Sequence, residues 1–125
     1  MDQNAEILKN AISGSLKIIE QDREKEIISR RFGLTGTKET LEQIGEMLSI
    51  TRERVRQLEK AILIRLQISA EEDEIPELAA ADKILVRYLI ESGRIAKISD
   101  LANKVYGRKA TASEKAGIYF IATFS

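Results

Sequence analysis

Residues 40–66, TLEQIGEMLSITRERVRQLEKAILIRL, decide the fold of the first half of this 125-residue chain. Two helical patterns flank Leu48-Ser49-Ile50, and a threonine, Thr40 or Thr51, precedes each of them. A threonine hydroxyl at that position accepts a hydrogen bond from a first-turn amide of the helix. Gln43 follows Thr40 by three residues, which completes a capping-box pattern. The stretch therefore predicts two short helices joined by a tight turn, a helix-turn-helix.

The helix that follows Thr51 separates apolar from polar side chains. At 100° per residue, its apolar positions fall within one arc of about 80°; they are Val55, Leu58, Ile62 and Leu66. Side chains that can pair with base edges occupy the other side: Arg52, Glu53, Arg56 and Gln57, with Lys60 beside them. A solvated charged face is the ordinary alternative. The cap, the turn and the polar set together favour DNA binding, because a helix-turn-helix places its second helix in the major groove.

Residues 23–66 resemble region 4 of bacterial RNA polymerase sigma factors of the housekeeping type. The matching motifs are Arg23-Glu24, Arg31-Phe32-Gly33, Thr40-Leu41-Glu42-x-Ile44-Gly45 and, most specifically, Thr51-Arg52-Glu53-Arg54-Val55-Arg56-Gln57-Leu58-Glu59. The resemblance implies a domain that binds the minus-35 promoter element and docks on the flap of RNA polymerase. It implies base contacts by Arg52, Glu53, Arg56 and Gln57. It implies phosphate contacts by Thr40, Thr51, Arg54 and Lys60.

Two departures from the family limit what the resemblance implies. Ala61 and Ile64 stand where the family usually has positive charge, which weakens the expected grip on phosphates at that end of the helix. No aromatic cluster of the kind that melts promoter DNA precedes Arg23. We therefore expect this chain to bind DNA without opening it.

The composition excludes several classes of protein. The chain is 43% hydrophobic and 32% charged, a soluble globular profile, with neither a long apolar run nor a signal-peptide pattern. It contains no cysteine and no histidine, which removes disulfides, thiolate zinc sites and the commonest general base. We expect a bacterial, cytoplasmic, non-enzymatic protein with no metal and no cofactor.

Charge divides the chain into three parts. Residues 21–69 carry ten basic and eight acidic groups, and residues 78–125 carry eight and four. Between them, residues 70–77 carry five acidic groups, no basic group and the only proline. The expected organisation is a sigma region 4-like domain at 1–69, an acidic linker at 70–77 and a second domain at 78–125. The linker is either simply solvated or a phosphate mimic that competes for the basic face.

Before the helix-turn-helix, two further helices are expected. Apolar spacing over residues 5–20 predicts one helix kinked at Ser13-Gly14-Ser15, or two short ones. Asp22 is expected to cap a second helix, and Gly33 to end it. Four helices around one small core form the expected first domain.

The last 48 residues show weaker patterns. A helix is expected over Leu78–Glu91, ended by Ser92-Gly93, and a short strand over Ile95–Ile98. Ser99 is expected to cap a helix that Gly107 stops, and a third helix runs over Ala112–Phe124. The order is similar to that of a winged-helix domain, although a plain three-helix unit fits equally well. The fold class is therefore mainly all-α.

Two apolar residues do not fit an ordinary recognition helix. Leu63 and Ile64 lie near the angular position of its polar side, one to two turns further along. Because exposed apolar surface is usually covered, we expect the second domain or a protein partner to pack there.

The sequence supports two functions above others. The first is a sequence-specific DNA-binding transcription regulator, or sigma-like factor, that binds a minus-35-type element through the helix starting at Thr51. The alternative is a protein-interaction module that docks on RNA polymerase without specific DNA contact. Double-stranded promoter DNA and the polymerase flap are the expected partners, with no membrane and no small-molecule substrate.

Overall fold

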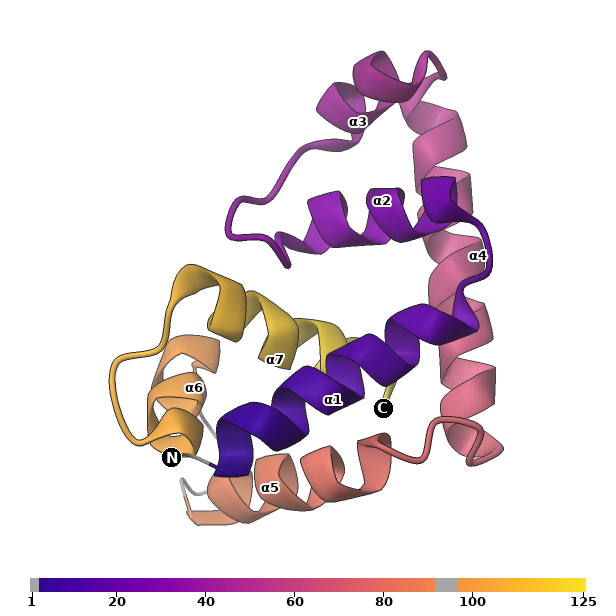
Figure 1. The fold of residues 1–125 in the computed structure, drawn as a ribbon. Helices are drawn as coiled ribbons and strands as arrows, with labels where there is room; N and C mark the ends of the chain where they lie inside the picture. The colour runs from indigo at the N-terminus through magenta and orange to yellow at the C-terminus, as the bar shows by residue number, and fades with distance from the viewer. Residues whose placement is uncertain (1–2, 92–96) are drawn as a thin grey trace.

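The computed structural model describes residues 3–91 and 97–125, in which seven α-helices form and no strand is present. In chain order they are α1 (Gln3–Ile18), α2 (Asp22–Phe32), α3 (Leu41–Leu48), α4 (Arg52–Glu71), α5 (Leu78–Glu91), α6 (Ile98–Tyr106) and α7 (Ala112–Phe124). In Figure 1, α2, α3 and the start of α4 form one end of the molecule, and α1, α5, α6 and α7 gather at the other. The expected all-α fold is confirmed.

The two threonine caps of the helix-turn-helix form as predicted. Thr40 Oγ1 accepts a hydrogen bond from the Gln43 amide at 3.1 Å, and Gln43 Oε1 accepts one from the Thr40 amide at 2.8 Å. Thr51 Oγ1 accepts from the Arg54 amide at 3.0 Å. Each hydroxyl thus satisfies a first-turn amide that has no partner within its own helix.

The turn between α3 and α4 depends on a glycine. Ser49 adopts a left-handed backbone conformation with φ 59°, and the Ile50 amide donates to the Gly45 carbonyl oxygen at 3.0 Å. A Cβ atom at position 45 would lie only 2.8 Å from the Ile50 carbonyl oxygen. Gly45 therefore allows the chain to fold back closely onto α3, which sets the start of α4 across it.

The helices enclose two hydrophobic cores of unequal size. The smaller core holds the helix-turn-helix together and consists of Ile27, Ile44, Val55 and Leu58. The larger core lies among α1, α5, α6 and α7, and it also receives Ile28 and Phe32 from α2 and Ile62 and Leu66 from α4. Helices α2 and α4 therefore contribute to both cores and join the two ends of the molecule.

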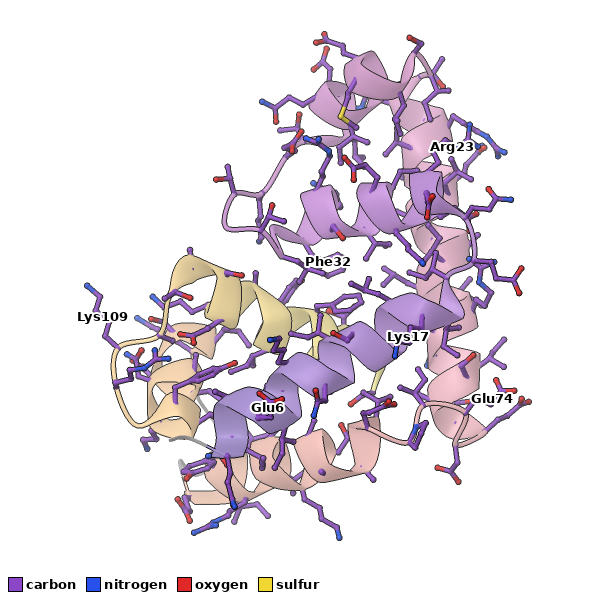
Figure 2. The ribbon with its side chains drawn as sticks, in the orientation of Figure 1. Glu6, Lys17, Arg23, Phe32, Glu74 and Lys109 are labelled. Carbon is purple, nitrogen blue, oxygen red and sulfur yellow. The ribbon has the colours of Figure 1, made fainter. Side chains whose placement is uncertain are left out.

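Aromatic residues form one link between the two ends. Figure 2 shows Phe32 pointing from the end of α2 toward α7. Its ring centroid lies 5.2 Å from that of Phe120, which in turn lies 5.1 Å from Phe124, both in edge-on geometry. Phe120 is completely buried. Such aromatic contacts add to the free energy gained from area burial alone.

Helix α1 forms as one helix, which excludes the alternative of two short ones, but its packing differs from the expectation. It is one continuous helix, in which the buried Ser15 hydroxyl donates to the Ala11 carbonyl oxygen at 2.7 Å. It packs chiefly on α5 and α7 rather than joining a four-helix core with the helix-turn-helix. The domain boundaries expected at residues 69 and 78 stay predictions. In the structure, however, α1 packs with the C-terminal helices.

The acidic segment lies far from the start of α4. Helix α4 has 20 residues and ends at Glu71, so it is about 30 Å long. Residues 71–74 are exposed, whereas Ile75 is buried in the larger core. Figure 2 shows Glu74 at the end of the molecule opposite the helix-turn-helix. Within one molecule the segment cannot cover the polar side chains that follow Thr51, which disfavours the phosphate-mimic alternative.

Helix ends in the rest of the chain confirm some predictions and correct others. Gly33 and Gly107 end α2 and α6 in left-handed conformations, with φ 74° and 69°. Asp22 does not cap α2: Gln21 holds that position without a side-chain hydrogen bond, and Asp22 is the first helical residue, where its charge suits the helix dipole.

The C-terminal half contains the three predicted helices but not the predicted cap. Helices α5 and α7 have the expected bounds. Ser99 does not cap α6, which begins at Ile98 with Lys97 in the cap position, because Ile98 packs against the larger core. Ile98 is thus helical rather than part of a strand. The rest of the strand prediction, at residues 95–96, and the Ser92-Gly93 helix end lie outside the described residues.

A charged cluster fixes the start of α7. Thr111 and Glu114 form a capping box, with Thr111 Oγ1 accepting from the Glu114 amide at 3.1 Å. Both carboxylate oxygens of Glu114 also accept hydrogen bonds from Arg108, each at 2.8 Å. Chiefly because of the Arg108 hydrogen bond, the pKa of Glu114 is lowered from 4.5 to about 2.

This lowered pKa predicts a pH-dependent contribution to stability. Because the folded-state pKa lies below the unfolded value, the Glu114 charge stabilises the fold at neutral pH, and this contribution is lost as the pH falls from about 5 to about 2. Glu114→Gln keeps a capping side chain but removes the charge. The difference in free energy of unfolding between the two proteins, from urea melts, should be greatest at pH 7 and should vanish near pH 2. A difference independent of pH would contradict the role of the charge.

The shared cores predict that both ends unfold together. Circular dichroism reports all seven helices, whereas the three tyrosines, at positions 88, 106 and 119, report only α5, α6 and α7. The two signals should give one coincident urea transition. Phe120→Ala should lower the free energy of unfolding by about 3–5 kcal/mol and shift both curves equally. Two separated transitions would mean that the ends are independent domains.

Candidate nucleic-acid interface

The first turns of α4 present the predicted polar side chains to solvent. Arg52, Glu53, Arg56, Gln57 and Lys60 are all exposed and are called here the polar face of α4. On the opposite side, Val55 and Leu58 are buried in the smaller core. The separation of apolar and polar sides predicted by helical periodicity is therefore present in the structure.

One ion pair lies within the polar face. Arg56 Nε donates to both carboxylate oxygens of Glu53, at 2.6 Å and 3.0 Å, and both side chains are 53% exposed. An exposed pair one turn apart contributes little to stability, so breaking it costs little. The pair occupies Nε and leaves the two terminal nitrogens of Arg56 without a described partner. Arg56 can therefore still donate two hydrogen bonds to a flat acceptor such as a guanine edge.

The other members of the polar face have no internal partners. Within the described residues, the side chains of Arg52, Gln57 and Lys60 make no hydrogen bond or ion pair, and neither does that of Arg54 on an adjoining side of the helix. These side chains are exposed, so their donors are accessible from solvent. Transfer of these donors to a polyanion would break no contact within the protein.

The two cap threonines combine a structural role with a free donor. Their oxygen atoms accept the backbone hydrogen bonds that start α3 and α4. A hydroxyl that accepts such a bond still has its own hydrogen to donate. Both residues are exposed. Thr40 and Thr51 can therefore each donate to a phosphate oxygen without losing the cap.

Arg31 belongs to this site although it was not among the predicted contact residues. A hollow of about 310 Å³ at the start of α3 is lined by Arg31, Thr40, Leu41, Glu42 and Arg52. Arg31 is held in place by Glu59 Oε2 at 2.7 Å and by the Glu39 carbonyl oxygen at 3.3 Å. The sequence signal was its position in the Arg31-Phe32-Gly33 motif, but its partner Glu59 lies 28 residues away. Two arginines and Thr40 thus line one hollow, together with one acidic residue, Glu42.

Leu63 and Ile64, the two apolar residues of α4 that are expected to be packed against another surface, have different surroundings. Leu63 is partly buried and packs against the larger core, as expected. Ile64 is 47% exposed, and Ile68 one turn further on is 48% exposed. The expectation that the second domain covers Ile64 is therefore wrong, and cover by a protein partner stays a prediction. Its side chain points along the same side of α4 as Gln57, away from both cores.

The charges of α4 are arranged against its dipole. Three arginines outnumber one acid, Glu53, in the first two turns, whereas Glu71 and Glu72 occupy the C-terminal end and no basic residue lies in the last turn. A helix is stabilised by acidic groups at its N-terminus and basic groups at its C-terminus. The observed order therefore costs stability at both ends, and the basic start of α4 is not explained by the stability of the helix.

Comparisons with known proteins identify the helix-turn-helix region. Residues 21–67 match the family "Sigma-70, region 4". A chloroplastic RNA polymerase sigma factor, sigF, of Arabidopsis thaliana is 37% identical over 68 residues, covering 54% of this chain and 12% of the relative. The RNA polymerase sigma factor SigA4 of Synechococcus elongatus is 39% identical over 57 residues, covering 45% of this chain and 18% of the relative. No solved structure matches the chain.

Residues 21–67 are therefore a sigma-70 region 4 domain, a helix-turn-helix domain of the DNA-binding class found in transcription factors. The domain runs from the residue before α2 into the second half of α4. The chain spans less than a fifth of the length of the two sigma factors. None of the described helices is long and apolar enough to cross a membrane.

The reversed charge order of α4 can be tested by two neutralising substitutions. Glu71→Gln removes an acid from the C-terminal end of α4 and should raise the free energy of unfolding at low ionic strength. Glu42→Gln removes an acid from the first turn of α3, where it suits the dipole, and should lower it. Both differences should shrink in 1 M salt because exposed charges are screened. A loss of stability in Glu71→Gln would contradict this account of the helix.

Proposed function

We propose that this protein is a sequence-specific DNA-binding transcription regulator, or sigma-like factor, that binds a minus-35-type promoter element through the start of α4. The observation that carries the proposal is the polar face of α4. Its base-pairing side chains are exposed at the start of the second helix of a region 4 domain. A face of this composition fits the major groove, where base edges present distinct patterns of donors and acceptors.

In this proposal, four residues contact bases. Arg52 and Arg56 donate to guanine, Gln57 pairs with adenine, and Glu53 accepts from the amino group of cytosine. The Glu53–Arg56 ion pair, at 2.6 Å, orients both side chains before DNA arrives. Its exposure means that either partner can exchange it for a base at small cost.

Phosphate contacts would hold the helix in register. Thr40, Thr51, Arg54 and Lys60 are exposed around the helix-turn-helix and carry free donors. The hollow lined by Arg31 and Arg52 offers a further place for a phosphate. Such contacts position a protein on the duplex without selecting a sequence.

RNA polymerase is the proposed protein partner, because both relatives are named as RNA polymerase sigma factors. A single helix-turn-helix module buries only about 600–1,000 Å² on DNA, too little for tight selective binding by itself. A second point of attachment, on the polymerase flap or through residues 78–125, would raise the effective concentration of the domain at its site. The proposed protein acts in the cytoplasm and has no enzymatic activity of its own.

Two alanine substitutions distinguish base contact from phosphate contact. With a site selected from random duplex DNA, Arg56→Ala should weaken binding by about 1–3 kcal/mol and relax the preference at one base pair. Lys60→Ala should weaken selected and random DNA alike and reduce the slope of log K against log salt by about one unit. Lys17→Ala, on α1 and outside both the helix-turn-helix and residues 78–125, is the matched control and should change neither the base preference nor the salt slope.

The same measurements distinguish this proposal from the alternative function, in which the chain docks on RNA polymerase without specific DNA contact. If the chain only docks on polymerase, no sequence will be selected, and Arg56→Ala will affect all duplexes equally or not at all. Either result would exclude base contact by the polar face of α4.

A further inference from the structure

A pocket lies between the region 4 domain and the C-terminal helices. It has a volume of about 510 Å³, within the range of about 300–1,000 Å³ that small-molecule sites occupy. One wall comes from Phe32 at the end of α2 and Lys38 in the following loop, and the other from Ile98 on α6 and Lys115, Ala116 and Tyr119 on α7. The pocket therefore opens where the two ends of the molecule meet.

The lining of this pocket combines apolar surface with positive charge. Phe32 and Tyr119 stand with ring centroids 5.8 Å apart, and Tyr119 remains 45% exposed although the neighbouring Phe120 is fully buried. Among the described residues that line it, the charged side chains are two lysines and none is a carboxylate. Lys38 Nζ lies 5.3 Å from the centre of the Tyr119 ring. The nearest acid in the adjoining hollow, Glu59, is already paired with Arg31 at 2.7 Å.

We propose that this pocket binds a small organic anion with an aromatic or otherwise apolar body. The apolar wall removes the body of such a ligand from water, which supplies most of the binding free energy. The two lysines then select for a negative charge, because a carboxylate or sulfonate beside them forms charge-assisted hydrogen bonds. A cationic or neutral ligand would leave both ammonium groups without a partner.

The position of the pocket gives its occupant a route to the helix-turn-helix. Lys38 stands two residues before Thr40, the cap of α3, and the opposite wall belongs to α7. A ligand bridging Lys38 and Lys115 would join the loop before α3 to the C-terminal helices. The ligand class itself follows from the lining residues and does not depend on DNA binding by α4.

An aromatic sulfonate and its uncharged analogue test the proposed ligand class. The probes are 8-anilinonaphthalene-1-sulfonate and N-phenyl-1-naphthylamine, which share an apolar body but differ in charge. Fluorescence titration of the full chain should show one sulfonate bound per molecule. Lys38→Gln and Lys115→Gln should each weaken sulfonate binding about three- to tenfold, as expected for a partly solvated charge contact. Neither substitution should change binding of the neutral probe, which should be at least about tenfold weaker in the unaltered protein.

Matched variants separate the pocket from other apolar surface. Lys83→Gln removes an exposed lysine of α5, and Ile68→Gln removes the most exposed apolar side chain of α4, and both should leave sulfonate binding unchanged. Ala116→Phe should fill the pocket and abolish it, with circular dichroism as the check on folding. The lysine substitutions lie at the surface and test the proposal even if Ala116→Phe fails to fold. Equal affinity for the two probes, insensitivity to both lysine substitutions, or loss of binding in Ile68→Gln would each overturn the proposal.

Discussion

The structure depends on one helix that is buried in two places. The N-terminal half of α4 gives Val55 and Leu58 to the core of the helix-turn-helix, and its C-terminal half gives Ile62 and Leu66 to the larger core. One continuous apolar stripe therefore orients the polar face of α4 and attaches it to the rest of the chain. Because interiors are close-packed, a rotation of α4 in one core would disturb the other. Packing in the two cores thus determines the direction in which the polar face of α4 points.

Local features were predictable because their partners are close in sequence. The caps at Thr40 and Thr51 involve atoms three residues apart, and the left-handed ends at Gly33 and Gly107 depend on the backbone of one residue. The exposure of the base-pairing side chains followed from helical periodicity alone. Ser99 was predicted wrongly because a cap contributes only about 1 kcal/mol, whereas packing of Ile98 against the larger core starts α6 earlier.

Contacts between residues far apart in the sequence could not be predicted from the sequence pattern. Periodicity identifies the apolar side of α1 but not its partner, so its packing on α5 and α7 was missed. The same limit applies to Leu63 and Ile64, adjacent residues of which only the first meets the core. Arg31 lines the hollow beside Thr40 and Arg52, and one of the contacts that hold it there is with Glu59, 28 residues away. In each case the missing information is which surfaces meet, and a single sequence does not contain it.

The 30 Å separation of charge along α4 has a consequence for encounters in solution. The chain has no net charge, so it gains little long-range attraction to DNA and little tendency to adhere to it indiscriminately. Arginines at one end of α4 and the acidic residues 71–74 at the other nevertheless separate opposite charges along this axis. Near a polyanion, the resulting torque turns the acidic end outward and the polar face inward during diffusion. In the proposed complex, this arrangement favours the approach of the polar face to the duplex without a net charge attraction between this chain and DNA.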